Sequence, residues 1–165
     1  FLKSKLNAAI TVLQKKDAVL QVKIDEVDEI MSPMFDFALM AKLTLGRKHW
    51  HKLTRENKEI FTELFTKLMR RSYLQKLTLY KNEKIIYEPS ILNKKKIQIP
   101  TYLISRDKKT SISYKLYKSQ NDWKIYDLEI QGVSIIRSYR SQFTQILQSG
   151  TIEDLLLELE KSVTN

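Results

Sequence analysis

Four side chains in this sequence are of types that often take part in catalysis or metal binding: His49, His51, Asp36 and Asp127. The two histidines flank Trp50, and residues two apart on a helix do not face each other. A zinc site would need further ligands at matching spacing, and the sequence offers no third ligand of that kind. We therefore interpret the histidines as part of a partly exposed helix end and predict no metal site.

Asp36 and Asp127 are acidic residues in apolar surroundings, a setting that suits acid–base catalysis. Each also has a structural explanation. Asp36 falls in the first turn of a predicted helix, where the helix dipole favours negative charge, and Asp127 can accept hydrogen bonds from neighbouring backbone or tyrosine hydroxyl groups. The glycines at 46, 132 and 150 are too far apart for a phosphate-binding loop, and G-x-S-x-G is absent. We therefore predict no catalytic residue and no enzyme.

The composition is that of one folded domain, which we place at residues 1–165. Hydrophobic residues make up 42% and charged residues 29% of the chain, and only three glycines and three prolines argue against disorder. The absence of cysteine excludes disulfides, thiolate catalysis and zinc–thiolate sites. No apolar run approaches the length of about 18 residues that a membrane-spanning helix needs.

The net charge of +10 favours polyanionic or anionic-membrane partners. The positive residues are dispersed, however, and we interpret most of them as solvated turns and helix faces. Adjacent positive residues occur at five separate places: Lys15-Lys16, Arg47-Lys48, Arg70-Arg71, Lys94-Lys95-Lys96 and Lys108-Lys109.

Residues 1–82 are predicted to be mainly helical, because apolar residues recur at helical spacing over 2–13 and 20–31. Ser32 and Pro33 resemble an N-cap and a first helical position, opening an apolar helix that Gly46 would end. Thr54 is the predicted cap of a long helix. Its apolar stripe runs over Ile60, Phe61, Leu64, Phe65, Leu68, Met69, Tyr73, Leu77 and Tyr80.

Residues 84–131 alternate with period two and predict an antiparallel meander of about four strands, at 85–89, 96–105, 111–118 and 123–130. Pro100 has no donor for a ladder, so we expect it at an edge or a bulge. Helices follow over 134–162, where Gly150 ends one helix and Thr151 with Asp154 resembles a capping box for the last. The predicted fold class is α+β, with helices packed on one curved antiparallel sheet.

The strand DWKIYDLEI, residues 122–130, is apolar on both faces over its first half. In a regular strand Tyr126, Leu128 and Ile130 would point to one side, and Trp123 and Ile125 to the other. A helix can cover one of these faces. The strand by itself leaves open whether ordinary core or a bound ligand covers the second face.

Several segments together resemble the MlaC family, the toluene-tolerance family of periplasmic phospholipid-binding proteins. MFDFALMAKLTLGRKHW and LTRENKEIFTELFTKLMRRSYLQKLTLY are similar to its central helices, with Leu45-Gly46, Trp50, Thr54, Tyr73 and the span from Leu77 to Tyr80 in the family pattern. IQIPTYLIS, DWKIYDLEIQGVSII and SQFTQILQSGTIEDLLLELEK are similar to later strands and closing helices of the family. The likeness covers residues 20–163 in one order. It departs at Asn57-Lys58, where the family has glutamine and arginine.

The resemblance implies a cone-shaped fold of NTF2-like or cystatin-like type with an apolar cavity between sheet and helices. It implies a soluble, monomeric periplasmic carrier, whose leader peptide we expect to be removed, that shuttles phospholipid and maintains outer-membrane lipid asymmetry. Its implied partners are phospholipid, an outer-membrane lipoprotein complex and an inner-membrane ABC transporter with its substrate-binding ring. It implies no cofactor besides the bound phospholipid.

The predicted lipid-binding residues come from the apolar helix, the strands and the segment after Gly132: Phe35, Phe37, Met40, Leu43, Ile99, Thr101, Leu103, Tyr114, Leu116, Trp123, Ile125, Val133 and Ile136. Phe61, Phe65 and Met69 are interpreted as ordinary core. A cavity for acyl chains would have a volume on the order of 1,000 Å³. Left dry and empty, it would cost roughly 20 kcal/mol, so we expect the protein to purify with lipid or to collapse partly without it.

Two other functions stay open at this point. The positive charge and eight tyrosines also suit a basic nucleic-acid-binding module, although the aromatic residues fall on apolar stripes, and we predict no nucleic-acid partner. A small α+β enzyme would use Asp36 or Asp127 in its pocket. For a phospholipid head group, Arg137, Arg140 or lysines at the pocket mouth could meet the phosphate, or the phosphate could lie in solvent.

Overall fold

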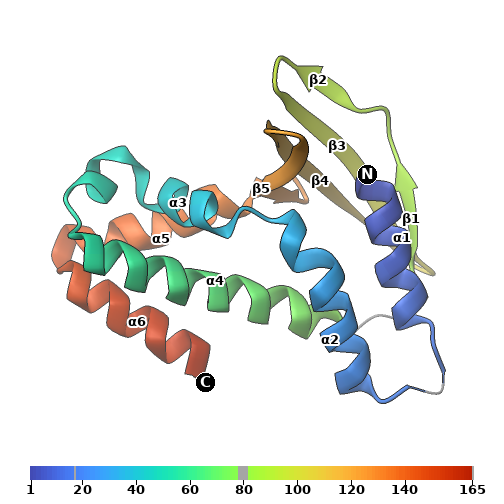
Figure 1. The fold of residues 1–165 in the computed structure, drawn as a ribbon, viewed down its shortest axis with the longest axis horizontal. Coiled ribbons are helices and arrows are strands. Elements are labelled where there is room, and N and C mark those ends of the chain that lie inside the picture. Colours follow the sequence, from blue (N-terminus) through green and yellow to red (C-terminus); the bar gives the residue numbers. More distant parts are fainter. Residues whose placement is uncertain (17, 78–81, 165) are drawn as a thin grey trace.

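The computed structural model describes residues 1–16, 18–77 and 82–164. Within this part the helices are α1 (Leu2–Leu13), α2 (Leu20–Met31), the 3-10 turn η1 (Ser32–Met34), α3 (Phe37–His51), α4 (Arg55–Leu77), α5 (Ile135–Ser149) and α6 (Ile152–Thr164). The strands are β1 (Lys84–Tyr87), β2 (Ile91–Asn93), β3 (Lys96–Ser105), β4 (Lys108–Ser119), β5 (Asp122–Ile130) and β6 (Val133–Ser134). Helices therefore begin and end the chain, with the strands between them (Figure 1).

The strands form one antiparallel sheet in the order β1-β3-β4-β5-β6, and β2 pairs with β3 next to β1. This confirms the predicted α+β class with one curved antiparallel sheet. The prediction of about four strands was too low, because the described residues include two further short strands, β2 and β6. With three and two residues, these strands are too short to produce a readable alternation.

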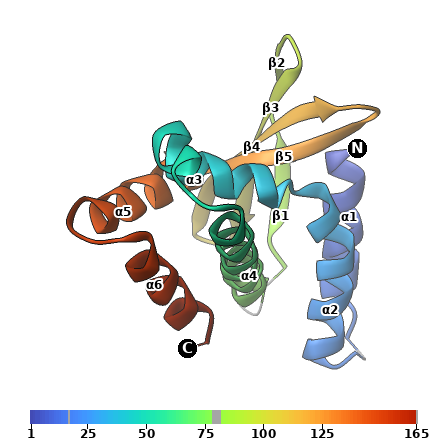
Figure 2. The same ribbon diagram turned by 60° about the vertical axis from the view of Figure 1, so that its left-hand side comes forward.

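The helices are arranged around the long helix α4 (Figure 2). The pair α1 and α2 lies on one side of α4 and the pair α5 and α6 on the other, with the sheet behind them. α3 packs against α4 and α5 and reaches β5, so it covers one end of the sheet. The helices therefore face the middle of the sheet from several sides.

Pro100 occupies a position in β3 where no ladder donor is needed. Its carbonyl accepts a hydrogen bond of 2.9 Å from the backbone nitrogen of Glu88, in the gap between β1 and β2. Because the nitrogen and carbonyl of one residue point to the same side of an antiparallel strand, the missing N–H also faces this gap. β3 thus pairs with β4 along its whole length, and Pro100 lies at the gap between β1 and β2 on the other edge of β3.

The predicted helix caps are confirmed at two places. The hydroxyl of Thr54 accepts a hydrogen bond of 3.1 Å from the nitrogen of Asn57 at the start of α4. Thr151 and Asp154 form a reciprocal capping box at the start of α6, with bonds of 2.8 and 3.3 Å. The stripe on α4 is buried at Phe61, Phe65 and Met69, whereas Ile60 is exposed and Tyr80 lies outside the described residues.

The start of α3 differs from the prediction. Ser32 is not its cap, because Ser32 begins the turn η1 and its hydroxyl is bound to Asp28 and Tyr73. α3 begins at Phe37, and Asp36 is its N-cap, accepting a hydrogen bond of 2.9 Å from the nitrogen of Leu39. The backbone nitrogen of Asp36 also donates to the carbonyl of Ile125, so η1 is followed by a short extended contact with β5 instead of a helix.

Gly46 interrupts α3 without ending it. Its φ of +77° lies in the left-handed region that glycine tolerates, and the helix resumes to His51. The interruption frees carbonyl groups of the preceding turn. The guanidinium of Arg140 on α5 donates to one of them, the carbonyl of Leu43, at 2.6 and 2.9 Å.

A β-bulge in β5 answers the question raised by its two apolar faces. Leu116 pairs with Ile125 but Tyr114 pairs with Leu128, so one extra residue lies in β5 between the two pairs. Since Leu116 and Tyr114 share a face of β4, Ile125 and Leu128 share a face of β5. The expectation that these residues point to opposite sides was wrong, because it assumed an uninterrupted strand.

Candidate functional site

A cavity of about 930 Å³ lies between the sheet and the helices. Its size is near the upper end of the range of about 300–1,000 Å³ for ligand pockets. Most of its wall is apolar and comes from five helices, α1, α2, α4, α5 and α6, and from the strands. The main apolar and aromatic contributors are Leu6, Ala9, Ile10, Leu13, Val27, Met31, Phe35, Leu68, Met69, Tyr73, Ile85, Leu103, Ile112, Tyr114, Leu128, Ile130, Val133, Ile135, Tyr139, Phe143, Ile146, Leu155 and Leu159.

The structure brings four of the predicted lipid-binding residues to the cavity wall: Phe35, Leu103, Tyr114 and Val133. Five others are buried in the core and are not part of the wall: Met40, Thr101, Leu116, Ile125 and Ile136. The remaining four are half-buried and also lie off the wall: Phe37, Leu43, Ile99 and Trp123. Lipid contact by the residues on the wall stays a prediction.

Most of the nine residues off the wall lie on α3 or at the end of the sheet that α3 covers. α3 and the segment before it cover one end of the sheet, where Phe35 bridges to Ile125 and core side chains fill the space. The cavity opens further along β3 and β4, around Leu103 and Ile112. One apolar sheet face thus changes from packed core to cavity wall along its length.

Sequence reasoning missed most of the wall that helices supply. α1, α2, α4, α5 and α6 each present apolar side chains to the cavity, and Met69, which we interpreted as core, is one of its lining residues. The stripes were visible in the sequence at helical spacing. Helical periodicity indicates that a face is shielded from water, but it does not indicate whether protein side chains or a ligand shield it. The apolar stripes therefore do not distinguish core residues from cavity-lining residues.

A polar cluster joins two helices at the cavity wall. The hydroxyl of Tyr73 donates to Asp28 at 2.5 Å, and Ser32 and Arg70 also donate to this carboxylate. Burial by itself would raise the pKa of Asp28, but the hydrogen bonds from Arg70, Ser32 and Tyr73 outweigh it and hold the pKa below its ordinary value of 3.8. Burial and the bond to Asp28 raise the pKa of the Tyr73 hydroxyl.

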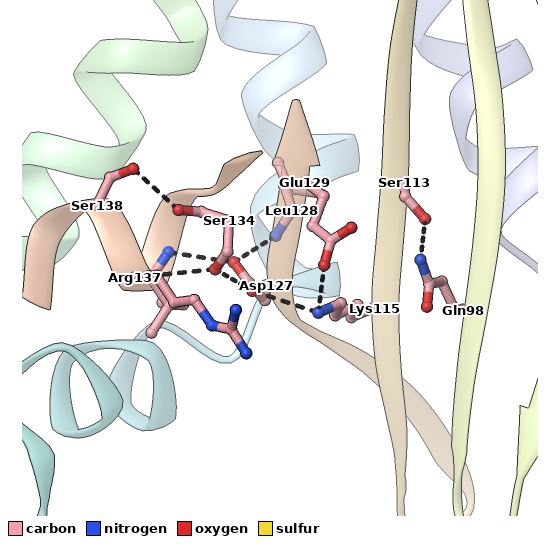
Figure 3. A network of polar contacts seen from close by, with 10 residues as sticks. Gln98, Ser113, Lys115, Asp127, Leu128, Glu129, Ser134, Arg137 and Ser138 are labelled. Carbon is pink, nitrogen blue, oxygen red and sulfur yellow. Dashed lines mark hydrogen bonds and ion pairs between the residues drawn. The ribbon is translucent and has the colours of Figure 1, made fainter. Parts of the chain in front are cut away.

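Asp127 holds the end of β5 against the start of α5 (Figure 3). Its carboxylate accepts hydrogen bonds from the hydroxyl of Ser134 at 2.5 Å and from the backbone nitrogens of Leu128 and Ile136 at 2.8 and 3.2 Å. Lys115 lies 4.0 Å from Asp127 and 2.6 Å from Glu129. The predicted backbone bonds are present, with a serine hydroxyl in place of a tyrosine. Asp127 is thus engaged in structural contacts.

Asp36 and the two histidines lie at opposite ends of α3. Asp36 caps α3 and accepts a hydrogen bond from the hydroxyl of Tyr117, while His49 and His51 lie in the last turn of α3. Neither aspartate lines the cavity. Among the residues that the structure describes, no group of three or more His, Cys, Asp or Glu side chains could hold a metal ion.

No lysine, arginine or histidine is among the described residues of the cavity wall. Within the described residues its polar and charged members are serines, tyrosines, Gln142, Glu83 and Glu158, without lysine, arginine or histidine. Arg137 and Arg140 do not line it, and Arg140 is bound to the carbonyl of Leu43. The described part of the wall therefore suits hydrocarbon. None of the described helices is long and apolar enough to cross a bilayer.

Both the fold and the sequence are similar to those of known proteins. The fold is similar to that of a phospholipid-binding protein from Ralstonia solanacearum solved in complex with a phospholipid, with a TM-score of 0.85 and 23% identity over 99% of this chain and 94% of that one. A toluene tolerance protein, Ttg2D, from Pseudomonas putida is 23% identical over 126 residues, which are 75% of this chain but 59% of that protein. The matched part of the chain therefore spans less than two thirds of the length of this relative. Residues 3–161 match the family described as MlaC protein, and the chain belongs to this family.

Proposed function

We propose that this protein is a periplasmic carrier that holds phospholipid by its acyl chains and shuttles it between outer- and inner-membrane complexes. The observation that carries the proposal is the cavity of about 930 Å³, whose wall is mostly apolar and has no cation among its described residues. The phospholipid held by the Ralstonia solanacearum protein supports the choice of ligand. Membership of the MlaC family supports the compartment.

The energetics of acyl chains favour such a carrier. Burial of hydrocarbon contributes about 0.8 kcal/mol per methylene, so two chains of about sixteen carbons represent about 25 kcal/mol. A lipid therefore spends almost no time free in water. A wall that matches the bilayer interior makes exchange between membrane and carrier nearly neutral, and the direction of transport would then come from the partners.

We propose the partners that the family implies: an outer-membrane lipoprotein complex and an inner-membrane ABC transporter with its substrate-binding ring. In this proposal the protein works as a monomer and maintains outer-membrane lipid asymmetry. It uses no cofactor and catalyses no reaction, which is consistent with the structural contacts of Asp36 and Asp127. Deletion of the gene should place phospholipid in the outer leaflet of the outer membrane, measured by surface labelling of lipid amines.

The direct test is the lipid content of the protein as purified without detergent. Organic extraction and mass spectrometry should find phospholipid in a stoichiometric amount. Stripping the lipid should lower the melting temperature, because an empty apolar cavity loses contacts along its whole wall. A preparation free of lipid, with an unchanged melting temperature and no uptake of phospholipid from vesicles, would contradict the proposal.

A further inference from the structure

One end of the sheet carries large apolar side chains at an open edge. Ile91 and Leu92 of β2 are 58% and 67% exposed. β2 is paired with β3, and within the described sheet its other edge is unpaired. In both ribbon views β2 and the turn after it project away from the helices. An exposed apolar pair on a projecting edge indicates a surface that another body covers.

The two apolar side chains point to opposite faces of this edge. Ile91 pairs with Gln98 and Leu92 pairs with Ile97, so the alternation of the strand sends one side chain to each face. A flat protein partner would cover one face and leave the other exposed. Entry of the strand edge into a soft apolar layer covers both side chains at once.

Positive charge surrounds the apolar pair. Lys94, Lys95 and Lys96 follow β2 directly, and all three are exposed. The backbone nitrogen of Lys118 donates to the carbonyl of Lys95, which brings a fourth exposed lysine to the same end. None of these lysines forms an ion pair with another described residue.

Acidic and aromatic residues complete this end of the sheet. Glu88 and Asp122 are its nearby exposed carboxylates, so positive charge prevails. The ammonium of Lys96 lies 5.4 Å from the ring of Tyr126, which contacts Tyr117 at 6.2 Å. Lysines beside tyrosines and aliphatic side chains are the combination found at bilayer interfaces.

We propose that this end of the sheet, which we call the β2 tip (Ile91–Lys96 with Lys118), docks on a membrane surface that contains anionic phospholipid. Ile91 and Leu92 enter the boundary between head groups and acyl chains, and the lysines contact the phosphates. The most exposed apolar residues of the tip are aliphatic, and the nearby rings of Tyr117 and Tyr126 are half-buried, so little aromatic surface is free for a nucleic-acid base to stack on. This favours a bilayer over a single strand.

The β2 tip is separate from the cavity. The strand residues that line the cavity, such as Leu103 and Ile112, lie at the opposite end of β3 and β4, and no residue of the tip is part of the wall. Membrane docking therefore goes beyond the carrier function and can be tested without disturbing it. Failure of the docking proposal would leave the lipid content of the cavity unchanged.

The test is co-sedimentation with vesicles at low and physiological salt. The wild-type chain should bind vesicles of equal parts phosphatidylglycerol and phosphatidylcholine, and should bind pure phosphatidylcholine vesicles far more weakly. Replacing Lys94, Lys95 and Lys96 by glutamine should weaken binding roughly a hundredfold, since each lysine near an anionic surface contributes roughly a fivefold factor. The double change Ile91→Ser and Leu92→Ser should weaken it at least about tenfold, because two side chains lose their burial.

Two matched variants control for charge and hydrophobicity elsewhere on the surface. Replacement of the exposed Lys42, Lys48 and Lys52 by glutamine, and the change Leu157→Ser at a 56% exposed position, should leave vesicle binding near the wild-type level. All variants should keep their co-purified lipid. Equal losses in tip and control variants, or unchanged binding of the Ile91/Leu92 variant, would overturn the proposal. Binding to single-stranded DNA without binding to vesicles would also overturn it.

Discussion

The hydroxyl of Tyr73 on α4 donates a hydrogen bond of 2.5 Å to Asp28 on α2, across the wall of the cavity. The ring of the same tyrosine stacks on Phe35, with 5.8 Å between the ring centroids. One side chain thus joins a polar bond between two helices to an aromatic contact with the segment that leads into α3. The α1–α2 pair is fixed to the rest of the molecule partly through this residue.

The Asp28 cluster predicts an acid-dependent contribution to stability. The folded pKa of Asp28 lies below its ordinary value, so the carboxylate stabilises the fold above about pH 4 and loses this contribution as pH falls through the lowered pKa. Asp28→Asn should cost about 2 kcal/mol at pH 7. Melting temperatures measured from pH 7 to pH 2.5 should show the variant and the wild type converging in acid. The control Asp25→Asn, on the exposed face of α2, should show no such convergence.

The bulge in β5 predicts that one residue can be deleted there without reversing the strand. Deletion of Tyr126 joins Ile125 to Asp127 and leaves Leu128 on the cavity side, because the deleted residue is the unpaired one. This variant should unfold cooperatively with a modest loss of stability. Circular dichroism and urea unfolding check the result. Aggregation or loss of the lipid cavity would contradict the assigned register.

Deletion of Asp127 is the matched comparison. It gives a strand of the same length with the same faces, but it removes the acceptor for Ser134 and the nitrogen of Ile136. Each buried donor left unpaired costs about 1–3 kcal/mol, so this deletion should be at least about 2 kcal/mol less stable than the deletion of Tyr126. Equal stabilities in urea would show that the contacts of Asp127 do not hold α5.

The cavity wall predicts opposite responses to the same enlargement at two positions. Ile112→Trp adds volume where the cavity has room, so it should reduce the phospholipid that co-purifies while the protein stays folded. Ile125→Trp adds the same volume at a fully buried position off the wall. It should destabilise by about 1–3 kcal/mol through overpacking. Lipid mass spectrometry and thermal unfolding of both variants provide the comparison, and similar behaviour would contradict the boundary drawn between core and cavity.

The cap of α3 predicts how Asp36 responds to substitution. Asp36→Ala should cost about 1 kcal/mol for the lost cap and somewhat more for the lost contact with Tyr117. Asp36→Asn should recover most of the cap, since asparagine is an equally good N-cap. Both variants should retain phospholipid. Loss of lipid in the asparagine variant, with stability preserved, would give Asp36 a role in binding that its contacts do not indicate.

Local signals in the sequence determined the longer helices and strands and several of their ends. Helical spacing located α1, α2, α4 and α5, a threonine cap started α4, and the pair Thr151 and Asp154 started α6. Alternation located the four longer strands. These features depend on interactions between residues within about four positions of each other, so the sequence is sufficient to predict them. The same information supported the α+β class and the family resemblance.

The tertiary structure alone decided which apolar face is core and which is cavity. Phe65 and Met69 stand one turn apart on the same stripe of α4, yet only Met69 lines the cavity. The bulge beside Tyr126 and the docking of η1 against β5 place α3 at one end of the sheet and leave the other part open. Hydrophobic burial is non-directional, so a sequence records that a side chain avoids water but not whether protein or lipid takes the water's place.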